Sequence, residues 1–169
     1  MEGWAIDYYG LRAAYRQSVL DQVRDSDRLH VSTLTWHPGK TTGVGGIRNC
    51  LQADSGASAR LSLVSPDGGQ AGNRTTSSMD ARLHELHGRG VLVVAGDHEC
   101  DPQFVADVEG SWKDAGLVSR PTNETFTAVL TADRLGIDLV TDDTDVHKLA
   151  GHWQVQTMTV TDFASTLAA

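Results

Sequence analysis

Residues 137–167 of the chain read IDLVTDDTDVHKLAGHWQVQTMTVTDFASTL. A short apolar run opens this stretch, and three acids follow it within four residues. Short apolar runs predict buried strands, and apolar residues at helical spacing predict helices. The expected elements are a strand at 137–141, a helical turn at 146–150, a strand at 153–158 and a helix at 161–167 with Thr161 as its N-cap. This order is typical of a parallel sheet with helices packed on it.

The rest of the chain continues the alternation of strands and helices. Expected strands lie at 3–7, 28–36 and 91–95, and expected helices lie at 9–24, 78–87, 102–115 and 123–135. Two helices carry end signals, namely Asp101, Pro102 and Gly116 for the first, and Thr122 or Asn123 with Gly136 for the second. We therefore predict an α/β fold of three layers, with a mainly parallel sheet and helices on both of its faces.

One segment, at about 37–80, does not fit this alternation. It is rich in Gly, Ser, Thr, Asp and Asn, and only residues 59–65 alternate as a strand would. An irregular connection of this length is uncommon inside a compact domain. The 169 residues nevertheless match one domain of ordinary size. We predict a single domain over residues 1–169 with an irregular Gly/Ser-rich segment at about 37–80.

The composition argues against several classes of protein. A formal net charge of −8 does not favour a nucleic-acid-binding module with a broad basic surface. Cys50 and Cys100 are too few for a disulfide framework or a four-cysteine zinc site. No apolar run approaches the roughly 18 residues of a membrane span, and the acidic start does not resemble a signal peptide. The expected location is the cytoplasm, with no membrane partner.

Acidic side chains follow several of the expected strands. Asp7, Asp97, Asp142 and Asp143 lie at or just after the ends of three of them. Ligands gather at the carboxyl ends of the strands in parallel sheets, and clustered carboxylates suit hard cations such as Mg²⁺ or Mn²⁺. Aspartates in these positions also form turns and cap helices. The pattern is compatible with a metal site and with a set of caps.

Residues 137–167 resemble the C-terminal part of PIN-domain proteins, the family of the VapC-type toxins. The shared features are the strand and acids Leu139-Val140-Thr141-Asp142-Asp143, a short helix after them, and the run Gly151-His152-Trp153-Gln154-Val155-Gln156-Thr157 before a final helix. The helix that ends at Gly136 is similar to the family's helix before this strand. Ala5-Ile6-Asp7 is similar to the family's opening strand with its first acid.

The resemblance implies a PIN-like fold and a metal-dependent endoribonuclease, the toxin of a toxin–antitoxin pair. The implied catalytic residues are Asp7, Asp142, Asp143 and Glu124. The implied ligands of Mg²⁺ or Mn²⁺ are Asp7, Asp142, Asp143 and Asp145. The implied partners are an RNA substrate, an antitoxin protein and a second copy of the chain in a homodimer.

Two departures from the family pattern leave a second function open. The register places Thr125 where the family has an acid, with Glu124 one residue early, and one residue turns a helical side chain by about 100°. Residues 36–50 contain no acid, although the family's second acid follows the second strand. The alternative is a catalytically degenerate PIN-like domain that binds a protein or RNA.

The loop at 96–101, GDHECD, leaves a third function open, that of an unrelated α/β enzyme. His98 and Cys100 suit a transition metal, whereas Asp101 also suits a helix cap. His84 and His87 are three residues apart and share a helix face, which we expect to be solvated. Residues 39–42 (GKTT) lack the complete phosphate-loop pattern, which excludes that function.

Overall fold

The computed structural model describes residues 3–38, 77–95 and 102–169. Most of the irregular segment predicted at about 37–80 therefore lies outside the described residues, including the strand expected at 59–65 and Cys50. The whole loop at 96–101 lies outside them too, with Asp97, His98, Cys100 and the expected cap Asp101. The third function rests on that loop and stays a prediction.

Five strands form one sheet in the order β3-β2-β1-β4-β5, and every neighbouring pair is parallel. The strands are β1 (Trp4–Ile6), β2 (Leu29–Val31), β3 (Leu92–Val94), β4 (Asp138–Val140) and β5 (Thr157–Met158). The central strand β1 lies between β2 and β4, so the chain builds outward from it in both directions. Parallel sheets open a crevice at their carboxyl edge where the strand order reverses in this way.

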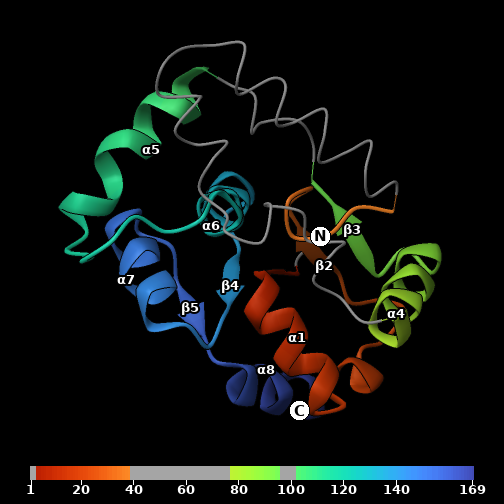
Figure 1. Ribbon diagram of the computed structural model, residues 1–169. Helices are drawn as coiled ribbons and strands as arrows, with labels where there is room; N and C mark the ends of the chain where they lie inside the picture. Colours follow the sequence, from red (N-terminus) through yellow and green to blue (C-terminus); the bar gives the residue numbers. More distant parts are fainter. Residues whose placement is uncertain (1–2, 39–76, 96–101) are drawn as a thin grey trace.

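Helices cover both faces of the sheet, which confirms the predicted three-layer α/β fold (Figure 1). One face carries α5 (Pro102–Asp114), α6 (Asn123–Leu135) and α7 (Thr144–His152). The other face carries α1 (Tyr8–Arg16), α4 (Ser77–Gly88), α8 (Val160–Ala168) and the short 3₁₀ helix η1 (Val19–Gln22).

Two hydrophobic clusters, one on each face, hold the layers together. The first contains Ala5 and Leu139 with residues of α6 and α7. The second contains Ile6 and Val140 with residues of α1, α4 and α8. Adjacent residues of one strand point to opposite faces of a sheet, so β1 and β4 each contribute to both clusters. This division explains why the strands read as short, continuous apolar runs.

Helix α6 agrees with its predicted range of 123–135. Thr122 is the N-cap, and its hydroxyl accepts a hydrogen bond from the backbone N–H of Thr125. Gly136 closes the helix with a φ of +66°, a conformation that favours glycine because it has no Cβ. The end signals in the sequence were sufficient here.

The predicted helix at 9–24 and the predicted strand at 28–36 were both too long. The helix ends at Arg16, because Ser18 adopts a φ of +60° and separates α1 from η1. The strand ends at Val31, and a turn follows in which the N–H of Thr35 bonds to the carbonyl of Ser32. The apolar pattern indicates which residues are buried but not where the backbone turns.

Boundaries near the C-terminus also differ from the prediction. The strand expected at 153–158 covers only Thr157–Met158, because Trp153 caps α7 and Gln154 adopts a φ of +60°. The last helix begins at Val160 with Thr159 as its N-cap, so the expected cap Thr161 was wrong. The side chain of Thr159 accepts the hydrogen bond from Asp162 that identifies the cap.

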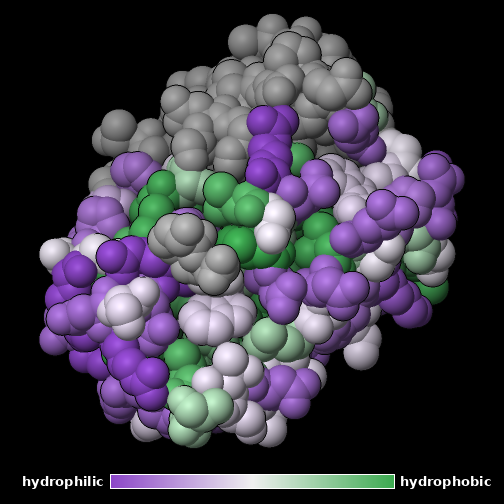
Figure 2. Space-filling model, turned by 180° about the vertical axis from the view of Figure 1, so that it is seen from behind, coloured by the Kyte–Doolittle hydropathy of each residue, from purple (hydrophilic) through white to green (hydrophobic). Residues whose placement is uncertain are grey.

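Hydrophobic residues are exposed at only a few places on the surface that the structure describes. The face behind that of Figure 1 shows hydrophobic residues in its middle, with hydrophilic residues around them (Figure 2). Among the described residues, the large hydrophobic side chains that are exposed are Tyr9, Val118 and Leu135. None of the helices described here has the length and apolar character needed to cross a membrane.

His30 gives the fold a pH dependence. Its side chain is buried in β2, and its Nε2 has no hydrogen-bond partner in the part of the chain that the structure describes. Burial, followed by the charge of Arg28, lowers the pKa of His30 from its ordinary value of 6.5. The unfolded chain therefore binds this proton more readily than the folded one, and stability falls as the pH drops through about 6.5.

Between about pH 8 and about pH 5.5 we expect the urea midpoint of unfolding to change less favourably in the wild type than in a His30→Leu variant, because only the wild type carries the His30 contribution. Leucine keeps the size of the buried side chain and removes the titrating group. Urea titrations of both proteins at the two pH values measure the difference. An equal change of the midpoint in both proteins would contradict this role of His30.

Candidate functional site

Asp7 follows β1 directly and begins α1. Its Oδ1 accepts a hydrogen bond from the backbone N–H of Gly10 at 2.7 Å, so the carboxylate caps the helix. Its Oδ2 accepts a hydrogen bond from the hydroxyl of Thr141 at 2.8 Å. The residue is fully buried. These contacts hold the carboxylate at the carboxyl end of β1, beside the end of β4.

Gly10 allows the first turn of α1 to approach β4. A Cβ at this position would lie 2.6 Å from the carbonyl oxygen of Val140 and 2.9 Å from Oδ1 of Asp7. Both separations are too short for carbon–oxygen contacts, and a packed backbone carbonyl moves only at a cost. The site therefore requires glycine here.

Thr141 connects Asp7 to the acids after β4. It is fully buried, and its hydroxyl oxygen accepts a hydrogen bond from the backbone N–H of Asp143 at 3.2 Å while the hydroxyl donates to Asp7. Asp143 is the N-cap of α7, where its Oδ1 accepts from the N–H groups of Asp145 and Val146. Its charge acts on Asp7. The fold thus brings Asp7 beside one of the three acids that follow β4.

Glu124 brings a third carboxylate from α6. It is the second residue of the helix and is only 3% exposed. Its Oε2 accepts hydrogen bonds from the backbone N–H of Tyr8 at 2.8 Å and from the hydroxyl of Thr35 at 2.6 Å. The resemblance aligned Thr125 with an acid of the PIN family. In the structure the backbone N–H of Thr125 donates to the side chain of the N-cap Thr122, and Glu124 is the residue whose charge acts on Asp7.

Asp142 and Asp145 have different surroundings from these three acids. Oδ1 of Asp142 accepts a hydrogen bond at 2.9 Å from the backbone N–H of Val160, the first residue of α8. Asp145 is an exposed residue in the first turn of α7. Neither acid is among the groups that shift the pKa of Asp7. The structure therefore groups Asp7, Glu124 and Asp143 and does not join Asp142 or Asp145 to them.

Replacing Asp142 with alanine is expected to lower the free energy of unfolding by roughly 0.5–1.5 kcal/mol, because the first N–H of α8 loses its acceptor. Asp162→Ala is the control, since it removes a charge from the same helix end without removing this hydrogen bond. Chemical denaturation of both variants measures the difference. A loss in Asp162→Ala as large as that in Asp142→Ala would show that the charge alone matters.

A group of hydroxyls beside Glu124 was missed by the sequence analysis. Ser32 and Thr35 are fully buried in the turn after β2, and their oxygens lie 3.1 Å apart. Thr127 of α6 donates to Ser32 at 2.8 Å. Among the described residues that follow the second strand, hydroxyls rather than an acid thus lie beside the site. The sequence feature that could have revealed these hydroxyls is the presence of Ser32, Thr33 and Thr35 close together. The predicted strand at 28–36 was too long and included them.

The carboxyl group of Asp7 has a pKa well above its ordinary value of 3.8. Burial is the largest cause, the charge of Glu124 is the next, and Asp143 adds a smaller effect in the same direction. Hydrogen bonds from Gly10 and Thr141 oppose the shift. Among the described residues, no basic side chain contributes to the shift of this pKa. Such a site favours the binding of a proton or of a cation.

The donor atoms suit a hard cation in their chemistry. Asp7, Glu124 and Asp143 offer oxygen only, and Mg²⁺ is usually bound through one or two carboxylates with several waters. Over residues 3–38, 77–95 and 102–169, however, no three Asp, Glu, His or Cys side chains are arranged to ligate one ion. Each carboxylate accepts hydrogen bonds from protein donors instead. A bonded carboxylate oxygen keeps a second lone pair, so the hydrogen bonds by themselves do not prevent these oxygens from contacting an ion.

The solvated face that we expected for His84 and His87 is found in part, because only His84 is exposed. Their rings lie 4.9 Å and 5.7 Å from the ring of Trp36, which is fully buried and donates to Asp80 at 2.9 Å. His84 is exposed, whereas His87 is half-buried. The pair helps to pack α4 against the turn that follows β2.

A scan against protein-family models gives no match to this chain, and neither does a search of curated proteins.

Proposed function

We propose that this protein is a metal-dependent endoribonuclease of the PIN type. The observation that supports the proposal most is that Asp7, Glu124 and Asp143 come together from three separate segments at the carboxyl ends of β1 and β4. Ligand sites of open parallel sheets lie at this edge, where the strand order reverses. The proposal includes RNA as the substrate, Mg²⁺ or Mn²⁺ as the cofactor, and an antitoxin protein as a partner in the cytoplasm.

The three carboxylates have different tasks in this proposal. Asp7 and Asp143 would hold the ion, and the hydroxyl of Thr141, which bonds to both residues, fixes their relative position. Glu124 would hold the start of α1 in place through the N–H of Tyr8, the residue next to Asp7. Bound Mg²⁺ or Mn²⁺ supplies an activated water and neutralises charge on the phosphodiester.

The experiment compares two neighbouring acids. Purified protein is incubated with a fluorescently labelled single-stranded RNA and Mn²⁺, with an EDTA-treated sample as the blank. Asp143→Asn should lose on the order of 100-fold or more in cleavage rate. Asp142→Asn should keep its activity, because an asparagine oxygen can still accept the hydrogen bond from Val160. Equal activity of the two variants, or no cleavage with any divalent ion, would contradict the proposal.

One observation favours a second candidate, a non-catalytic PIN-like domain that binds a partner. Both oxygens of Asp7 and Oε2 of Glu124 already accept hydrogen bonds from protein groups, and no group of three ligands occurs within the described ranges. Calorimetric titration with Mn²⁺ separates the candidates. A saturable heat that disappears in Asp7→Asn supports the nuclease, whereas the absence of binding supports the second candidate.

A further inference from the structure

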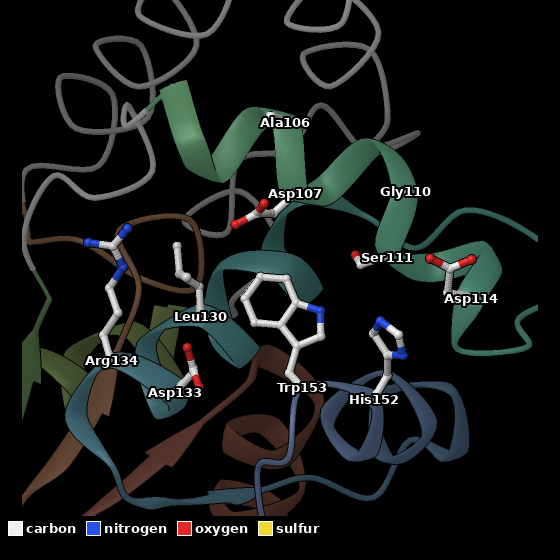
Figure 3. A pocket seen from close by; sticks show the side chains of 10 residues that line it. All are labelled: Ala106, Asp107, Gly110, Ser111, Asp114, Leu130, Asp133, Arg134, His152 and Trp153. Atoms are coloured by element: carbon white, nitrogen blue, oxygen red, sulfur yellow. The ribbon is translucent and has the colours of Figure 1, made fainter.

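A pocket of about 600 Å³ lies between α5, α6 and α7 (Figure 3). This volume is in the range of small-molecule sites. Neither Asp7, Glu124 nor Asp143 lines it. The pocket is therefore separate from the site proposed for the nuclease, and what it binds is an independent question.

Trp153 gives the pocket an aromatic surface. Part of the side chain packs on the hydrophobic cluster beneath α6 and α7, and the ring lies in the middle of the lining residues in Figure 3. Its backbone N–H bonds to the carbonyls of Leu149 and Ala150, which fixes the residue at the end of α7. The face of an indole ring attracts organic cations more strongly than that of any other aromatic side chain.

The charges in the pocket have the sign that a cation requires. Its lining contains three carboxylates, those of Asp107, Asp114 and Asp133, and one guanidinium, that of Arg134. The formal excess is therefore two negative charges. Figure 3 shows Asp114 and Asp133 on opposite sides of the Trp153 ring. Carboxylates beside an indole favour cations and disfavour anions.

Ser111 is an independent indication of a ligand. The residue is only 7% exposed, and its hydroxyl has no hydrogen-bond partner in the described part of the chain. Figure 3 shows it on the wall that α5 forms, across from Trp153. Buried hydroxyls are nearly always hydrogen-bonded, so this unsatisfied and covered oxygen in the pocket wall favours a donor that enters with a ligand as the atoms over it shift.

We propose that this pocket binds an organic cation that carries guanidinium or ammonium groups. The cation lies on the ring of Trp153, pairs with the carboxylates of Asp114 and Asp133, and donates a hydrogen bond to Ser111. Free polyamines carry such groups, and so do the basic side chains of a peptide. The shared chemistry is the proposal, and the two sources are separate arms of the experiment.

The experiment measures binding to the full-length chain by calorimetry. The probes are N-acetylarginine amide, triarginine and spermidine, with N-acetylcitrulline amide as a neutral analogue of the first. The arginine probe should bind at least about fivefold more tightly than the citrulline probe. Tighter binding of triarginine than of spermidine identifies a peptide as the source, and the reverse order identifies a free amine.

Variants test the residues. Trp153→Leu and the double variant Asp114→Asn/Asp133→Asn should each weaken binding about threefold to tenfold. Both aspartates are exposed, so the double variant carries little risk to folding. Asp162→Asn, an exposed acid of α8 outside the pocket, should leave the affinity unchanged. Equal binding of the arginine and citrulline probes would overturn the proposal, as would wild-type affinity in the double variant.

Discussion

Asp7→Asn is expected to abolish cleavage of RNA and at the same time to make the metal-free protein more stable. The loss of activity should be on the order of 100-fold or more, because the variant removes a proposed ligand of the ion. The gain in stability follows from burial. Asp7 is fully buried and next to the charges of Glu124 and Asp143, so its ionised form is unfavourable in the folded state.

The gain in stability should depend on pH with a defined sign. The folded pKa of Asp7 lies above the unfolded value of 3.8, so the unfolded chain releases this proton first, and stability falls as the pH rises from about 3.8 up to the folded pKa. The neutral amide has no such penalty, and asparagine is also a good N-cap for α1. The difference between the variant and the wild type should therefore be small in acid, grow as the pH rises from about 3.8, and become constant above the folded pKa.

Thermal unfolding in EDTA across a series of pH values measures this difference. A gain of 1 kcal/mol corresponds to a rise of roughly 2–4 °C in the melting temperature for a chain of this size. Asp142→Asn serves as the control, since that residue is exposed and has no part in the shift of the Asp7 pKa. A melting temperature of Asp7→Asn below that of the wild type at every pH would contradict the argument.

Gly10→Ala should have the opposite effect on stability and should also eliminate activity. The added Cβ would lie 2.6 Å from the carbonyl oxygen of Val140, so α1 must move away from β4 and carry Asp7 with it. Overpacking of this kind costs typically about 1–3 kcal/mol. The same movement would break the contact between Asp7 and Thr141 that positions the carboxylates.

Gly110→Ala is the matched control for this prediction. Gly110 also lies in a helix, but a Cβ there would meet no atom within 4 Å. Alanine should therefore stabilise α5 by up to about 1 kcal/mol through its higher helix propensity. Denaturant titrations of both variants give the two free energies, and cleavage assays report the site. Equal stability changes would show that the close contact at Gly10 is relieved without cost.

The layered fold could be predicted from local patterns in the sequence. The run at 91–95, the caps at Thr122 and Gly136 and the apolar spacing of α6 each identify an element from neighbouring residues alone. Boundaries set by single backbone conformations could not be predicted. Ser18 and Gln154 both adopt positive φ, although neither residue type signals it.

The candidate site was predictable only as a list of acids. Asp7, Asp142 and Asp143 all follow strands, and nothing local distinguishes Asp143, which lies beside Asp7, from Asp142, which accepts a hydrogen bond from α8. The role of the hydroxyls at Ser32 and Thr35 was also hidden, because their partner Glu124 lies 89 residues from Thr35 along the chain.

The amino-acid sequence by itself determined the class of fold, the order of most strands and helices, and the presence of acids at strand ends, because burial and capping depend on residues a few positions apart. Only the tertiary structure decided which acids meet. Glu124 bonds to a residue 116 positions away, and Thr141 bonds to one 134 positions away. Such meetings depend on how the parallel strands align and how closely α1 approaches β4, and both are properties of the packed chain.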